Sequence, residues 1–185
     1  MMKSKYMFQI FFLVIAMILD AMVMAVFPVD YSFKSYFFIS MFGFTLIILF
    51  LSELSSLNAV VLAFCYGLVL DFFSSKGFFI NALSIMLTIA FVYLLGKRLS
   101  YTKVEVVMLV IFGVFMRELL MFAFASGQGV LSISFYNYLQ KQMFGSVLFN
   151  TVFCFIAFGL NNGYRHFMKR NDQRLRRSEK SLRYR

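Results

Sequence analysis

Six long apolar runs, separated by short polar segments, dominate the pattern of hydrophobic and polar positions along the chain. A helix that crosses a bilayer needs about 20 apolar residues, with roughly 17–25 tolerated. The pattern predicts six transmembrane helices, at residues 7–27, 36–51, 57–73, 78–96, 104–125 and 141–160. The longest connection covers residues 127–140, which we expect to form a loop.

The runs are continuous, whereas the strands of an outer-membrane barrel alternate between apolar and polar positions. Hydrophobic residues make up 62% of the 185 residues and charged residues 14%. A soluble domain has roughly 45–50% apolar and about 25% charged residues. We therefore predict an all-α integral membrane protein, with a six-helix transmembrane domain at 1–160 and a basic cytoplasmic tail at 161–185.

The basic residues set the expected orientation, because short loops on the cytoplasmic side of a membrane protein carry an excess of Lys and Arg. With the N-terminus inside, the cytoplasmic side holds five Lys and Arg residues of the N-terminus and the 97–103 loop, plus nine in the tail, against three outside. Both termini are thus predicted to be cytoplasmic. The tail is expected to contact anionic lipids rather than nucleic acid, through Arg165, Lys169, Arg170, Arg174, Arg176 and Arg177.

Charged residues inside membrane helices are expensive and mark functional candidates. Asp20 and Arg117 are each the fourteenth residue of a predicted outward-running helix, so both are expected at the same depth. We predict an ion pair between them; an anionic ligand on Arg117 or a proton path are the alternatives. Glu118 points about 100° away from Arg117 around the helix, and is expected to face a partner helix or the outer water.

Small residues recur every four positions along the third predicted helix, at Ala59, Ala63 and Gly67, and Asp71 follows at the same spacing. Such a stripe lets two membrane helices approach closely. Two interpretations stay open. The stripe packs inside the protein while Asp71 caps the following turn, or the stripe and Asp71 contact a partner protein.

The sequence contains no catalytic motif and no set of His and Cys residues with the spacing of a metal site. His166 is the single histidine, and Cys65 and Cys154 both lie inside apolar runs. We therefore predict no enzymatic activity, no cofactor and no metal.

Several short motifs between residues 27 and 95 point to a family. Pro28 follows the first helix, Gly67 and Asp71 form a G-L-x-x-D pattern, Gly77 lies in the next turn, and Asn81-Ala82-Leu83 follows that turn. In these features the chain resembles the MreD family of bacterial rod shape-determining proteins.

The resemblance implies a non-enzymatic membrane scaffold of the cell-wall elongation complex, located in the bacterial inner membrane. Its expected partners are an MreC-like bitopic membrane protein and, directly or indirectly, MreB and the peptidoglycan synthases. The partner and packing candidates are Ala59, Ala63, Gly67, Asp71 and Gly77. The family is also similar in fold to the substrate-binding subunits of energy-coupling factor transporters. The alternative function is therefore a vitamin-binding membrane subunit with an aromatic-lined pocket open to the outside.

Overall fold

The computed structural model describes residues 2–27, 36–73 and 79–161, and within these ranges it contains helices and no strand. The all-α prediction is confirmed. The elements are α1 (Met2–Val26), α2 (Phe42–Phe50), α3 (Ser56–Phe73), α4 (Ile80–Gly96), α5 (Lys103–Gly127), α6 (Phe135–Tyr138) and the π-helical turn η1 (Leu139–Met143). The last of these continues without a break to Asn161, in what we call the last helix (Phe135–Asn161). The predictions for Gly77 and for the basic residues of the tail fall outside the described residues.

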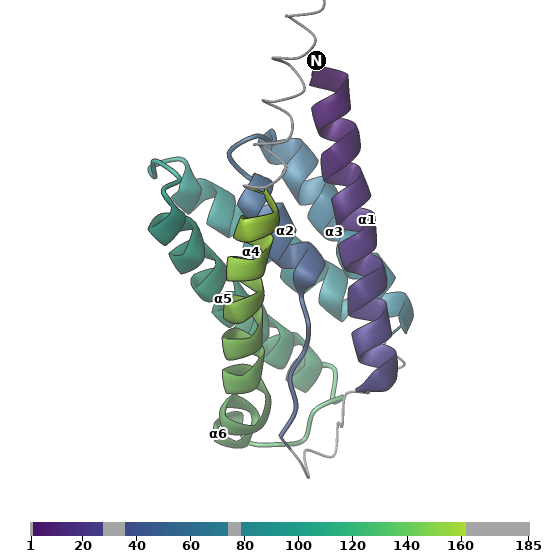
Figure 1. The fold of residues 1–185 in the computed structure, drawn as a ribbon. Coiled ribbons are helices and arrows are strands. Elements are labelled where there is room, and N and C mark those ends of the chain that lie inside the picture. Colours follow the sequence, from purple (N-terminus) through teal and green to yellow (C-terminus); the bar gives the residue numbers. More distant parts are fainter. Residues whose placement is uncertain (1, 28–35, 74–78, 162–185) are drawn as a thin grey trace, which may run out of the picture.

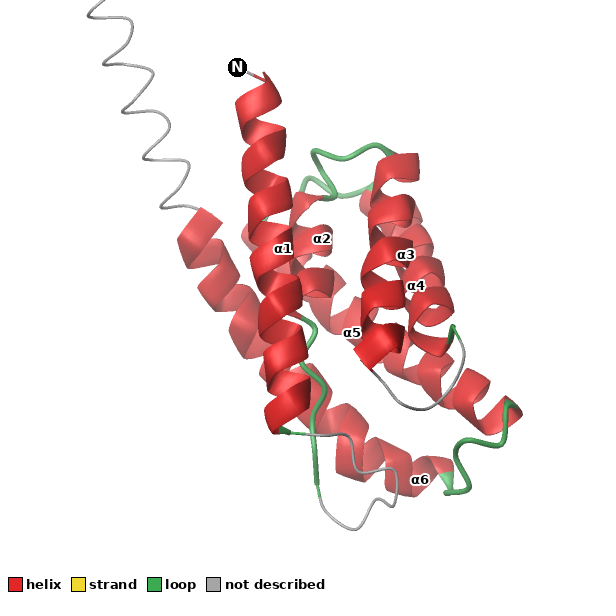
Figure 2. Ribbon diagram, turned by 90° about the vertical axis from the view of Figure 1, so that its right-hand side faces the viewer, coloured by secondary structure: helices red, strands yellow, loops and turns green. Residues whose placement is uncertain are grey.

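Four helices are long and apolar enough to cross a membrane: α1, α3, α5 and the last helix. This fits a multi-pass membrane protein. Helix α4 is apolar but has 17 residues, and α2 has only nine. In both views the long helices run roughly along one direction, and α6 lies at the end of the bundle opposite the N-terminus (Figures 1 and 2).

The predicted continuous helix at 36–51 is wrong. Residues 36–41 are extended, and helix α2 begins only at Phe42. Figure 1 shows the extended part leading from the α6 end of the bundle up to α2 at its centre. All nine residues of α2 are buried. A helix that is apolar on every side suits such a central position, because it has no face that must meet water.

The predicted loop at 127–140 is also shorter than expected, because the last helix begins at Phe135. Ser134 caps this helix, and its hydroxyl accepts a hydrogen bond from the backbone of Asn137. The change brings Tyr138, which was expected in a loop, onto a helix with its side chain buried.

Helices α3 and α4 approach closely at Gly67. A Cβ atom at this position would overlap the backbone of Ala82 in α4. Ala59 and Ala63 of the same stripe are buried as well. In α3 the stripe of small residues is therefore used for packing inside the molecule, which is the first of the two interpretations that the sequence left open.

Candidate functional site

The N-terminus of α2 is capped by a carboxylate from another helix. Met41, the residue before α2, offers no capping side chain. Instead, Asp20 of α1 accepts hydrogen bonds from the backbone N–H groups of Phe42 and Gly43, both at 2.9 Å. The hydroxyl of Tyr66 in α3 donates a third, at 2.6 Å. A negative charge is favourable at this position, because the free N–H groups and the helix dipole make a helix N-terminus positive.

These contacts overturn the predicted ion pair between Asp20 and Arg117. Asp20 is fully buried, and its bonding partners are α2 and Tyr66. Arg117 is fully buried too, but it forms its ion pair with Glu118. Equal depth in the membrane is a necessary condition for pairing, but it does not decide which way each side chain points around its helix.

The extended segment before α2 is held by side chains of the last helix. Ser146 accepts a hydrogen bond from the backbone N–H of Ile39 at 3.0 Å. The side-chain amide of Asn150 forms two hydrogen bonds with the segment. Its nitrogen donates to the carbonyl of Ile39 at 2.9 Å, and its oxygen accepts from the N–H of Met41 at 2.8 Å. Extended backbone at membrane depth is tolerated only where its polar groups are satisfied within the protein. Ser146 and Asn150 form these hydrogen bonds with the backbone of Ile39 and Met41.

Helix α4 repeats the arrangement seen at α2. The residue before it, Phe79, has a φ of 58° and forms no side-chain cap. Asp71 at the end of α3 accepts hydrogen bonds from the backbone of Asn81 and Ala82, both at 2.9 Å, and from the Asn81 side chain at 3.0 Å. Asp71 thus caps the element that follows it, as the first of the two interpretations proposed.

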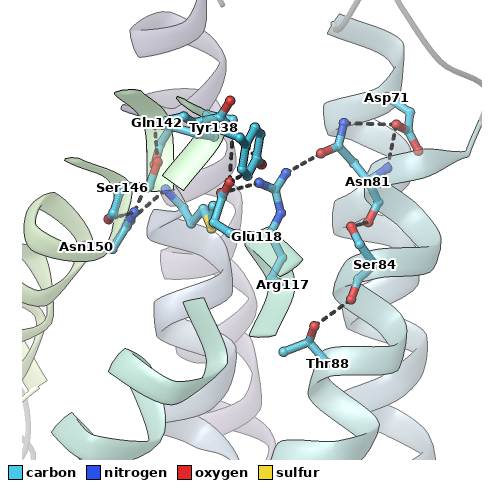
Figure 3. A network of polar contacts seen from close by, with 12 residues as sticks. Asp71, Asn81, Ser84, Thr88, Arg117, Glu118, Tyr138, Gln142, Ser146 and Asn150 are labelled. Carbon is cyan, nitrogen blue, oxygen red and sulfur yellow. Dashed lines mark hydrogen bonds and ion pairs between the residues drawn. The ribbon is translucent and has the colours of Figure 1, made fainter. Parts of the chain in front are cut away.

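A buried ion pair lies next to this second cap (Figure 3). Nη1 of Arg117 is 2.6 Å from Oε1 of Glu118, and both side chains are fully buried. Nη2 of Arg117 donates to the side-chain oxygen of Asn81. The expectation that Glu118 faces a partner helix or the outer water is wrong, because Glu118 points into the protein.

Two side chains of the last helix complete the surroundings of Glu118. The hydroxyl of Tyr138 donates to Oε2 of Glu118 at 2.5 Å, and the amide of Gln142 donates to the same oxygen at 2.9 Å. Gln142 lies in the π-helical turn η1. π-Helical turns are rare overall, but those that occur are often found at functional sites. They change the direction in which a side chain points relative to a regular helix.

Together these contacts form one polar network, which Figure 3 follows from α3 to the last helix. Asp71 is joined to Asn81, Asn81 to Arg117, Arg117 to Glu118, and Glu118 to Tyr138 and Gln142. The network carries two carboxylates and one guanidinium, and it ties α3, α4, α5 and the last helix together. Breaking a buried pair by removing one partner typically costs about 3–5 kcal/mol. The network therefore fixes the relative positions of four helices.

The geometry of the network favours a structural role over a ligand site. Two apolar cavities lie beside α1, one against α2 and α3 and the other against α2 and the last helix, and no network residue lines either of them. Among the described residues, no group of three or more His, Cys, Asp or Glu side chains is arranged to hold a metal ion.

Sequence reasoning missed the polar side chains of the last helix, although a signal was present. Tyr138, Gln142, Ser146 and Asn150 recur every four residues, which places them on one face of a helix. All four are buried. A stripe of polar side chains on an otherwise apolar helix indicates a buried polar surface. This stripe could have identified the last helix as the element that hydrogen-bonds to Glu118 and to the extended segment.

Comparison of the chain with family models, with curated proteins and with solved structures gave no match.

Proposed function

We propose that this protein is a non-enzymatic membrane scaffold of the cell-wall elongation complex, of the kind that the MreD family represents. The supporting observation is that the motif residues behind the resemblance act as one physical unit. Gly67 lets α3 approach α4 at Ala82, and Asp71 caps α4 at Asn81 and Ala82. A G-L-x-x-D pattern followed by an asparagine and an alanine is what this helix pairing requires.

In this proposal the chain crosses the membrane six times, with both termini in the cytoplasm. The segment 36–51 would cross as a broken helix, extended and then helical. At about 3.3 Å per extended residue and about 1.5 Å per helical residue, its length is roughly 35 Å. That length is close to the thickness of a bilayer core, about 30 Å. The capping of α2 by Asp20 makes such a break tolerable within the membrane.

A scaffold must keep its shape while partners bind its outer surface. The charged groups of the site point inward and are bonded to one another, and large apolar side chains cover the outside of the long helices. This surface suits the transmembrane helix of an MreC-like bitopic protein, and through it a connection between MreB and the peptidoglycan synthases.

The competing function is a vitamin-binding subunit of an energy-coupling factor transporter. Such a subunit needs a cavity with convergent polar groups. Here Asn81 of α4, Arg117 and Glu118 of α5, and Tyr138 and Gln142 of the last helix are bonded to each other, which favours the scaffold.

The test is affinity purification of the tagged full-length protein from native membranes in mild detergent, with mass spectrometry of the proteins that co-purify. We expect an MreC-like bitopic protein and wall synthases. Gly67→Leu, which separates α3 from α4, should reduce their recovery. Gly127→Leu, at the end of α5 where an added Cβ atom meets nothing within 4 Å, is the matched control. Recovery of a paired ATPase and a coupling membrane subunit instead would contradict the proposal.

A further inference from the structure

A cavity with two cationic side chains lies at the turn between α4 and α5, away from the polar network. Its volume is about 450 Å³, and it is lined by Leu94, Leu95, Lys97 and Arg98. Helix α4 ends at Gly96, so the two leucines belong to its last turn and the two cations follow it directly. Both views show the α4–α5 turn at the end of the bundle that holds the N-terminus (Figures 1 and 2).

The side chains of Lys97 and Arg98 are not needed to end α4. The backbone N–H of Lys97 donates to the carbonyl of Tyr93, and that of Arg98 to the carbonyl of Leu95, both at 3.2 Å. Among the described residues, neither side chain forms an ion pair with a carboxylate. The ammonium of Lys97 stands over the ring of Tyr93, 5.4 Å from its centroid. This contact orients the side chain but leaves its net charge in place.

The turn that presents the two cations is held on both sides. Tyr101 has a φ of 54°, and its hydroxyl lies so close to Gly96 that a Cβ atom there would overlap it. Thr102 and Glu105 form a capping box at the start of α5. Glu105 is the acidic residue closest in sequence to the two cations, but its carboxylate accepts from the backbone N–H of Thr102 at 2.8 Å and does not line the cavity.

The cavity changes from apolar to cationic along the chain. Leu94 and Leu95 are 60% and 41% exposed, and in a membrane protein such side chains meet lipid. Lys97 and Arg98 come next, at the end of the helix. A phospholipid has the same order of groups, acyl chains followed by a phosphate. The volume of about 450 Å³ lies within the range of roughly 300–1,000 Å³ that is usual for ligand pockets.

Charge selects among the phospholipids. Ammonium and guanidinium groups form strong, charge-assisted hydrogen bonds with phosphate oxygens. A zwitterionic lipid would bring an ammonium group to two cations as well as a phosphate, and none of the four lining residues is acidic. The cavity therefore favours a headgroup with a net negative charge.

We propose that the cavity at the α4–α5 turn binds an anionic phospholipid, with its phosphate between Lys97 and Arg98 and its acyl chains along Leu94 and Leu95. This site goes beyond the proposed scaffold function and is independent of it, since it uses none of the residues that join α3 to α4. It also differs from the lipid contacts expected of the tail, because it lies in a defined cavity between two helices.

The experiment is native mass spectrometry of the full-length protein released from vesicles with equal parts of phosphatidylglycerol, phosphatidylethanolamine and phosphatidylcholine, all with identical acyl chains. The three lipids share the phosphate, and only phosphatidylglycerol has a net charge. We expect it to be retained about tenfold more than either of the others, which is in the range for two Lys or Arg side chains beside an anionic lipid.

Two double variants locate the effect. Lys97→Gln with Arg98→Gln should abolish most of the preference for phosphatidylglycerol; both side chains are exposed, so the fold should be kept. Lys180→Gln with Arg183→Gln removes the same two charges from the tail and should leave most of the preference. Equal losses in the two double variants would show general attraction by net charge and would overturn the proposal. Equal retention of the three lipids by the wild-type protein, as expected if the turn contacts an acidic protein instead, would also overturn it.

Discussion

Helices α2 and α4 begin in the same way, yet the two beginnings have different consequences for the molecule. Neither helix has a polar capping residue of its own, and each receives an aspartate from another helix. Asp20 is fully buried, and it accepts hydrogen bonds from two backbone N–H groups and the hydroxyl of Tyr66. Asp71 is only partly buried, but Asn81 links it to the ion pair of Arg117 and Glu118.

A capping carboxylate can therefore serve only its own helix N-terminus, or it can also be hydrogen-bonded into a larger polar network. At α2 the cap stabilises a break in a membrane segment, and among the described residues no hydrogen bond joins it to the buried ion pair. At α4 the cap is one end of a network that reaches the last helix.

Replacing Arg117 by Met should cause the largest loss, because it leaves Glu118 as a buried charge without its cation. We expect the free energy of unfolding, measured by denaturation in mixed micelles, to fall by about 3–5 kcal/mol. Adding Glu118→Gln removes the orphaned charge and should restore part of the loss. A double variant that is less stable than Arg117→Met alone would contradict the assigned pairing.

Replacing Asp20 by Ala should cost about 3 kcal/mol, the upper end of the range for leaving buried donors unsatisfied. The N–H groups of Phe42 and Gly43 and the hydroxyl of Tyr66 all lose their acceptor. Asp20→Asn keeps one acceptor oxygen and should lose less. If both substitutions were neutral in the same unfolding assay, Asp20 would not be the cap of α2.

Replacing Gly67 by Ala should lower stability by about 1–3 kcal/mol, because the added methyl group forces α3 away from the backbone of Ala82. Gly159→Ala is the matched control, since a Cβ atom at Gly159 meets nothing within 4 Å. This control should be neutral or slightly stabilising, as Ala favours helices more than Gly does. Equal effects of the two substitutions would argue against close packing at Gly67.

Replacing Asp71 by Ala should have the smallest direct effect, about 0.5–2 kcal/mol, the usual range for the loss of a helix cap. Asp71 is partly exposed, so water can replace some of its hydrogen bonds. Thermal unfolding in detergent, with Asp20→Ala measured alongside, checks the order. A larger loss for Asp71→Ala than for Asp20→Ala would reverse the comparison.

The helical character of the chain could be predicted from its apolar runs, but the break at residues 36–41 could not. A run of apolar residues looks the same whether it forms one helix or an extended segment followed by a helix. What decides is the pair of Ser146 and Asn150, which lie more than 100 positions away and satisfy the extended backbone.

The charged residues of the site could be predicted, whereas their pairing could not. Asp20, Asp71 and Arg117 stand out because charges are rare in apolar runs. The partner of Asp20, however, is a helix N-terminus, and no side chain in the sequence reveals where that N-terminus lies. Adjacent residues on a helix point in different directions, which argued against Arg117 and Glu118 as a pair, but their long side chains meet all the same.

Two double-mutant cycles test whether the cap of α4, which is hydrogen-bonded to the buried ion pair through Asn81, is coupled to that pair more strongly than the cap of α2 is. Unfolding free energies are measured for Asp71→Ala and Arg117→Met, singly and together, and in the same way for Asp20→Ala and Arg117→Met. The account predicts a coupling energy of about 1 kcal/mol or more for Asp71 with Arg117, and additivity within about 0.5 kcal/mol for Asp20 with Arg117. Additivity of Asp71 with Arg117, together with strong coupling of Asp20 with Arg117, would contradict it.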